Sequence, residues 1–240
     1  MSQPPRLSTV GAVCAISTVA RFVGGAVLMG SSGVEMLIPE TGDPGLEWVA
    51  DVDTASGLSF VGARLVVLMG FLGIVAFVGF YDVLREAGTV MVVAPILGAV
   101  GLTLVTVSHL APISMAYQLV PAYAAADPAA QATLAATFDT FAAMALETNA
   151  AGNFLGWGDA VPMFGAAIIR TRALPRWIGW LGLVTGVLAG WLGLLSPVSD
   201  VMEGISGLGF IGFFVFMLSM GVVILRLPRK VEARTPAALH

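Results

Sequence analysis

Long runs of apolar residues dominate the chain and set its predicted elements. A helix that crosses a bilayer core needs about 20 predominantly apolar residues. The predicted spans are residues 20–38, 57–81, 89–111, 150–169, 177–196 and 205–226. Residues 8–19 are also apolar and are expected to lengthen the first span or to lie in the interface, and a cleaved signal peptide is the competing interpretation. The pattern predicts an all-α, polytopic transmembrane helix bundle of six spans, in a single membrane domain over residues 1–240.

The segment between the third and fourth predicted spans is too long for a hairpin loop, and Pro112 and Pro121 punctuate it. Its second half, residues 129–148, places apolar side chains on one face and polar side chains elsewhere, which is an amphipathic helical pattern. Three arrangements fit this pattern. The segment packs over the outer mouth of the bundle, lies in the outer interface, or continues straight into the fourth span. We expect residues 113–148 to form an extracytoplasmic helical cap.

Basic residues are concentrated on one side of the predicted topology. All of the 11 Lys and Arg residues except Arg64 fall in the N-terminal segment, the C-terminal tail or the connections on one side. Acidic residues crowd the first and last loops of the other side. Because cytoplasmic segments of membrane proteins are enriched in Lys and Arg, we expect both termini to be cytoplasmic. Arg21 is then expected at the cytoplasmic start of the first span, where its side chain can reach the interface.

Composition excludes several classes of protein. Only 11% of the residues are charged and 58% are hydrophobic, whereas soluble domains carry about 25% charged residues. The single cysteine, Cys14, excludes a disulfide framework and a cysteine metal site. The one lysine, Lys230, lies in the tail and excludes a retinal Schiff base, and two histidines are too few for bis-histidine haem ligation between spans. We expect no cofactor and no metal site, and the short basic tail favours lipid headgroups over nucleic acid.

The stretch Arg-Thr-Arg-Ala-Leu-Pro-Arg-Trp-Ile-Gly-Trp-Leu-Gly-Leu over residues 170–183 is the most recognisable part of the chain, and Ala-Arg-Phe-Val-Gly-Gly over residues 20–25 accompanies it. These motifs resemble a group of bacterial six-helix integral membrane proteins catalogued only as a domain of unknown function. The resemblance covers residues 20–226. The connection over residues 81–86 departs from that group in being shorter and less polar. The resemblance implies a six-helix membrane fold and supplies no activity and no site residues.

Ionisable and polar residues inside the predicted spans are the candidate functional residues, because such groups are costly in lipid. The predicted ligand-binding residues are Arg64, Asp159, Trp157, Asn153, His109 and Glu35. Arg64 lies about 10 Å inside the second span at 1.5 Å per residue, and Asp159 lies at a similar depth in the fourth. Their common depth predicts one polar pocket that opens to the outside.

Two interpretations of these residues stay open. In the structural one, Arg64 and Asp159 form a buried ion pair that sets the helix register, and Asn149 and Asn153 supply hydrogen bonds between helices. In the functional one, the same residues bind a small hydrophobic or anionic ligand. We expect an integral plasma-membrane protein, non-catalytic, that binds a small or lipid-like molecule in an outward-facing pocket. It would serve as a carrier or as an accessory subunit of a membrane complex. Its expected partners are membrane lipids and a homo-oligomeric or membrane-complex partner.

A catalytic alternative comes from residues 30–33, Gly-Ser-Ser-Gly, which resemble the GxSG string of intramembrane serine proteases. Ser32 would be the nucleophile and His109 the base. The match carries little specificity in a chain with 29 glycines, and its serine lies in the first span, whereas that family places it in a later helix. An intramembrane hydrolase and a purely structural membrane partner protein are therefore the alternatives to a binding protein.

Overall fold

The structure, a computed structural model, describes residues 6–34, 48–52, 55 and 57–227. Within these ranges the chain is helical and contains no β-strand. The α-helices are α1 (Leu7–Gly30), α3 (Gly57–Leu84), α4 (Val90–Ala125), α5 (Pro128–Asn153), α6 (Val161–Thr171), α7 (Arg176–Thr185) and α8 (Asp200–Arg226). Two π-helices, Phe154–Ala160 and Gly186–Trp191, and two 3₁₀ segments, Arg85–Ala87 and Leu192–Val198, join them.

Five helical stretches of the described chain are long and apolar enough to cross a membrane, so the fold is compatible with an integral membrane protein. They are Leu7–Gly30, Gly57–Ala87, Val90–Ala125, Arg176–Leu195 and Val201–Arg226. The predicted fourth span, residues 150–169, is not one of these five. It runs without a break through the end of α5, the first π-helix and α6. The number of six crossings stays a prediction.

α1 begins and ends earlier in the chain than the predicted span 20–38. It includes residues 8–19, and it ends at Gly30. Gly33, in the turn that follows, has a φ of 86°, a left-handed conformation that glycine adopts without steric cost. Arg21 therefore lies about 21 Å from the start of the helix at 1.5 Å per residue, half-buried in its middle. The expectation that Arg21 begins the span is wrong, because the apolar run that precedes it belongs to the same helix.

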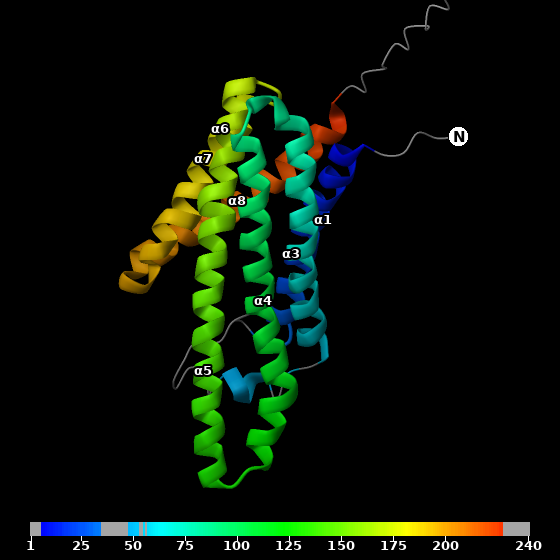
Figure 1. Ribbon diagram of the computed structural model, residues 1–240. Coiled ribbons are helices and arrows are strands. Elements are labelled where there is room, and N and C mark those ends of the chain that lie inside the picture. The colour runs from blue at the N-terminus through cyan, green and yellow to red at the C-terminus, as the bar shows by residue number, and fades with distance from the viewer. Residues whose placement is uncertain (1–5, 35–47, 53–54, 56, 228–240) are drawn as a thin grey trace, which may run out of the picture.

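α4 and α5 form an antiparallel hairpin that projects from the rest of the bundle (Figure 1). α4 has 36 residues, a length of about 54 Å, against about 30 Å for a bilayer core. The helix continues through Pro112 and Pro121, because each proline removes only one backbone hydrogen bond. Asp127 begins α5 by accepting a hydrogen bond from the Ala130 amide (2.9 Å). Residues 113–148 thus extend α4 and α5, instead of folding across the bundle as the expected cap.

A small apolar core attaches the described part of the first outer loop to this hairpin. Residues 48–52 form a short helix, and the Trp48 ring packs on Phe138 of α5 with centroids 5.8 Å apart. Met29 at the end of α1 and Val120 of α4 belong to the same cluster of buried residues. The outer loop and the hairpin therefore form one packed unit beyond the end of α1.

The centre of the bundle is filled by phenylalanines from several helices. The fully buried ones there are Phe77, Phe80, Phe164, Phe213 and Phe216. α1 and α3 approach each other closely on one side of this core. A Cβ atom built on Gly11 would lie 2.5 Å from the Cα atom of Gly79, so the two backbones are nearly in contact at their crossing. Small residues at helix crossings are typical of helix association in lipid.

One end of the bundle carries most of the described arginines, and we call it the basic end. It contains Arg6, Arg85, Arg170, Arg172, Arg176 and Arg226, which lie at helix ends and connections. α1 begins and α8 finishes there, side by side (Figure 1), with Gly221 of α8 against Ala12 of α1. The α4–α5 hairpin projects from the opposite end.

Candidate functional site

A cavity of about 280 Å³ lies between α1, α3, α4, α5, the first π-helix and α8. Its lining residues are Phe22, Met69, Val105, His109, Asn149, Asn153, Trp157, Glu203, Ser206, Gly207 and Phe210. This volume is close to the lower limit of the 300–1,000 Å³ range of small-molecule sites. Residues from five separate regions of the sequence therefore line a space large enough for a small organic molecule.

The cavity lies in the half of the bundle away from the basic end. Phe22, Met69 and Phe210 each lie about 22 to 24 Å from that end along their own helices, at 1.5 Å per residue. Glu203 lies about 35 Å from it, in the exposed first turn of α8. The cavity therefore extends from the interior of the apolar helices to the opposite end of the bundle, where Glu203 marks its outer edge.

Two polar atoms without a hydrogen-bond partner belong to residues that line this cavity. They are the side-chain oxygen Oδ1 of Asn153 and the indole nitrogen Nε1 of Trp157, and both atoms are buried. Trp157 as a whole is only 5% exposed. Leaving a buried donor or acceptor unpaired costs about 1–3 kcal/mol. An acceptor and a donor four residues apart on one helical segment thus have no hydrogen-bond partner, and both belong to residues of the cavity lining.

The π-helix Phe154–Ala160 carries Trp157 and follows directly after Asn153. It packs against the second π-helix, where the Trp191 indole N–H donates to the Gly158 carbonyl oxygen (3.1 Å). A Cβ atom on Gly190 would overlap the Cα atom of Gly158, so only glycine at position 190 permits this approach. π-helical turns occur frequently at functional sites.

The α4 side of the cavity is held by hydrogen bonds to α5 and within α4. The Ser108 hydroxyl donates to Asn149 Oδ1 (3.3 Å). His109 Nδ1 lies 2.6 Å from the Val105 carbonyl oxygen, and a carbonyl only accepts, so Nδ1 carries the proton. In the neutral ring the second nitrogen, Nε2, is then an acceptor. These bonds fix the orientations of Asn149 and His109.

Aromatic rings form the α1 and α8 side of the cavity. Phe22 and Phe210 meet edge to face with centroids 5.1 Å apart, and Trp157 lies 4.9 Å from Phe210. Phe22 also stacks on Phe214 at 4.2 Å. The cavity thus has an aromatic wall next to its polar Asn153 and Trp157 groups.

The structure separates the six predicted site residues. His109, Asn153 and Trp157 line the cavity together, whereas Glu35 lies outside the described residues. Arg64 is exposed and does not line it. Asp159 is half-buried in the π-helix and is also absent from the lining. In the described part of the chain no ion pair joins Arg64 to Asp159.

Arg64 instead interacts with α4 on the outside of the α3–α4 pair. Its Nη2 donates to the Tyr117 hydroxyl (2.9 Å), and its guanidinium carbon lies 5.4 Å from the centroid of the Tyr117 ring. Phe60 stacks on the Tyr117 ring with centroids 4.7 Å apart. Arg64 and Asp159 therefore do not share one pocket with His109, Asn153 and Trp157, because equal depth along two helices does not place side chains on facing sides.

Sequence reasoning missed the residues that α1, α3 and α8 contribute, above all Phe22, Phe210 and Glu203. Glu203 precedes the predicted sixth span, which begins at residue 205, so the hydrophobic pattern assigns it to the preceding loop. Its position four and seven residues before Gly207 and Phe210 places it on their face of α8. That spacing was the available signal. The sequence gives no comparable signal for Phe22 and Phe210, since the chain has 13 phenylalanines and nothing distinguishes these two.

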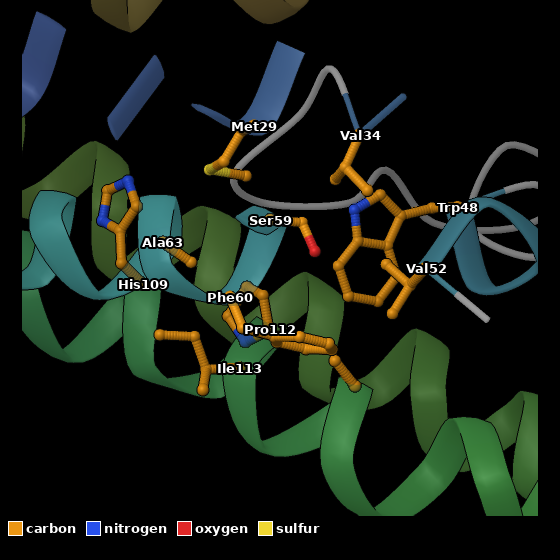
Figure 2. A pocket seen from close by; sticks show the side chains of 11 residues that line it. Met29, Val34, Trp48, Val52, Ser59, Phe60, Ala63, His109, Pro112 and Ile113 are labelled. Atoms are coloured by element: carbon orange, nitrogen blue, oxygen red, sulfur yellow. The ribbon is translucent and has the colours of Figure 1, made fainter. Parts of the chain in front are cut away.

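A second, smaller pocket shares His109 with the cavity (Figure 2). Its volume is about 30 Å³, room for about two water molecules. Figure 2 shows His109 at one end and Trp48 at the other, with Ser59 between them. This pocket is too small for an organic ligand, so the larger cavity is the candidate site.

The residues of the catalytic alternative do not meet. The Ser32 hydroxyl donates to the carbonyl oxygens of Met29 (2.8 Å) and Leu28 (3.1 Å) at the end of its own helix. His109 bonds to Val105 and lies 3.3 Å from the Ser108 hydroxyl, and no hydrogen bond joins it to Ser32 among the described residues. Nothing in this arrangement activates Ser32 as a nucleophile.

The described chain is all-helical, its apolar helices are compatible with an integral membrane protein, and a cavity lies between these helices. Comparisons of the chain with protein-family models, with curated proteins and with solved structures find no match.

Proposed function

We propose that this chain is a non-catalytic integral membrane protein that binds a small amphipathic molecule in the cavity between α1, α4, the first π-helix and α8. It would act as a carrier or as an accessory subunit of a membrane complex. The observation that carries the proposal is the pair of unpartnered buried atoms, Asn153 Oδ1 and Trp157 Nε1, in the lining of a cavity of about 280 Å³.

The chemistry of this pair defines the polar part of the ligand. Trp157 offers an N–H donor, and Asn153 Oδ1 offers an acceptor. A hydroxyl group both accepts and donates, and so does a primary amide, so either group pairs with both atoms at once. The remaining lining is largely apolar and aromatic, which suits a hydrocarbon or aromatic body. A molecule with one small polar group and an apolar body matches both features.

The proposal includes a topology with six crossings. Residues 128–171 form one uninterrupted helical stretch, and their predicted span 150–169 adds a sixth crossing to the five candidate helices. An even number of crossings puts both termini on one side, and the arginines of the basic end favour the cytoplasmic side. The cavity then opens toward the outside of the plasma membrane. Reporter fusions at residues 88 and 173 and at the two termini, all cytoplasmic here, test this topology.

Native mass spectrometry on the protein in lipid nanodiscs tests the binding proposal. The wild-type chain is expected to carry a reproducible additional mass, and Asn153→Leu and Trp157→Phe are expected to lower its occupancy about tenfold, the effect of one hydrogen bond to a buried group. Trp180→Phe is the matched control, because Trp180 is 59% exposed on α7 and loses the same N–H group. Asn153→Leu keeps the approximate shape of the side chain, and Trp180→Phe loses the same ring atoms as Trp157→Phe, so the control also matches the loss of volume.

The other outcomes separate the alternatives. A second polypeptide in the spectrum, together with the bound small molecule, assigns the accessory role. A wild-type chain without any additional mass, in which Asn153→Leu raises the thermal stability, contradicts the proposal. In that case the unpartnered atoms are a cost of the fold, and the protein is a structural membrane partner. Loss of the additional mass in Trp180→Phe as well would mean that the mass binds elsewhere.

A further inference from the structure

We propose that the molecule bound in the cavity is an amine-bearing amphiphile. Its ammonium group lies near Glu203 and the Phe22–Phe210 wall, and a neutral hydroxyl or carbonyl group reaches Asn153 and Trp157. This inference rests on the proposed function and names the chemical class of the ligand.

Charge is the first argument for an amine. Glu203 carries the only formal charge among the side chains that line the cavity, if His109 is neutral. No Lys or Arg belongs to that lining. Arg21 precedes Phe22 on α1 but is not part of it, and Arg64 contacts Tyr117 on the outside of the bundle. An anionic ligand, which Arg64 had led us to expect, would find no cation in this cavity and would face a carboxylate.

The charge distribution of the whole chain acts in the same direction. No Lys or Arg occurs in residues 86–169 or 177–225, the segments that contribute Val105 to Trp157 and Glu203 to Phe210. Among the described residues that lie farther from the basic end than Phe22, Arg64 is the one basic residue, and the other charged residues are acidic. A surface of one sign raises the local concentration of ligands of the opposite sign. Organic cations are therefore favoured at the outer edge of the cavity.

The aromatic wall is the second argument. The Phe210 ring meets Phe22 edge to face with centroids 5.1 Å apart and lies tilted 4.9 Å from Trp157, and Phe210 lies two turns after Glu203 on α8. Aromatic faces attract ammonium groups, and recognition of amines by aromatic side chains is a recurrent use of this interaction. The lining of one cavity thus contains a carboxylate and aromatic rings, the two elements of an amine site.

A simple alkylammonium ion would leave one atom unpaired, because an ammonium group has no acceptor for the Trp157 N–H. A second, neutral polar group is needed to accept from Trp157. A hydroxyl group at that position also donates to Asn153 Oδ1. Amino alcohols and amino amides satisfy all three groups, whereas simple amines, acids and hydrocarbons do not.

A set of linear probes of equal length tests this inference. Amino alcohols of four to eight carbons are compared with the diols and the hydroxy acids of the same length by ligand-observed NMR. The protein is kept in dodecyl maltoside, which contains no amine, at pH 8, where histidine side chains are ordinarily neutral. We expect the amino alcohol to bind at least about fivefold more tightly than the diol, and the hydroxy acid to bind most weakly.

Glu203→Gln is the decisive variant, and it should make the amino alcohol and the diol bind equally. Glu147→Gln is its matched control, because Glu147 is exposed on α5, outside the lining, and loses the same charge. It should leave the preference for the amine intact. Glu203 also lies in the first turn of α8, where an acid stabilises the helix dipole. The thermal stability of both variants is therefore measured without a probe, to detect any loss of stability. An unchanged affinity of Glu203→Gln for the diol then shows that its cavity is intact.

Equal binding of diol and amino alcohol to the wild-type protein, or tighter binding of the hydroxy acid, would overturn the inference. If Asn153→Leu still abolished binding of the diol and the hydroxy acid, the proposed binding site would remain supported, and only the preference for an amine would be wrong. Absence of binding by every probe also overturns the inference, and the additional mass in nanodiscs then decides the proposed function separately. A short-chain phosphatidylethanolamine added as a competitor identifies the source of the amine. Competition indicates a lipid headgroup, and its absence indicates a free amine.

Discussion

The crossing of α1 and α3 at Gly11 and Gly79 supports a prediction of stability that can be worked out from the structure. A Cβ atom on Gly11 would lie 2.5 Å from Gly79 Cα, 3.1 Å from Gly79 N and 3.2 Å from the carbonyl oxygen of Ala76. All three are backbone atoms, so no side chain can rotate away. Gly11→Ala must therefore push the two helices apart.

The size of the effect follows from contact distances. Carbon atoms pack at about 3.5–4.0 Å, so the helices must separate by about 1 Å at this crossing. Overpacking of this kind costs about 1–3 kcal/mol. Gly24→Ala is the matched control on the same helix, because nothing lies within 4 Å of its added methyl group. There the substitution gains up to about 1 kcal/mol of helix propensity, so the two variants should differ by about 1–4 kcal/mol.

Cys14 provides the assay, since it is the one cysteine of the chain, half-buried on α1 and packed against the central core. A thiol-reactive fluorophore added to the protein in detergent micelles reports thermal exposure of Cys14. Gly11→Ala should lower the midpoint by roughly 2–12 °C at 2–4 °C per kcal/mol, and Gly24→Ala should leave it unchanged or raise it. Equal midpoints for the two variants would refute the close contact of α1 with α3.

Three further substitutions test other contacts. Asp127→Ala removes the cap of α5 and should cost about 1 kcal/mol, seen as faster hydrogen exchange in the first turn of that helix. Trp48→Ala removes a buried side chain packed on Phe138 and should lower stability by about 3–5 kcal/mol. The loop should then detach from the hairpin, and limited proteolysis near residue 50 should increase. Tyr117→Phe removes the exposed hydrogen bond to Arg64 and should change the unfolding midpoint by less than about 3 °C, whereas a larger change would indicate that this pair lies in a less polar environment.

Several features of the fold were predictable from the sequence. Long apolar runs identified the helices, because the backbone of a chain in lipid has to satisfy its own hydrogen bonds. The clustering of arginines at one end of the bundle followed from their places between these runs. The position of Asn153 and Trp157 on the same side of their helix was also predictable from the sequence, since residues four apart share one face of a helix.

Helix boundaries and the form of the outer segment were less accessible. The expected extension of the first helix over residues 8–19 is confirmed, but α1 stops at Gly30, eight residues before the end of the predicted span. α4 passes through Pro112, which was read as a break, because packing against α5 compensates for one lost hydrogen bond. The π-helices had only their glycines as a signal, and glycine is common throughout the chain.

The sequence by itself determined the all-helical class, the apolar character of the helices and the depth of each polar residue, because depth is a coordinate along one helix. Only the tertiary structure decided which polar residues meet. Arg64 and His109 lie at similar depths, yet Arg64 faces outward with Tyr117, and His109 lines the cavity. α3 is apolar on nearly all sides, so its pattern defines no inward face. The direction of each side chain is then set by the close packing of the backbones, as at Gly11 and Gly79.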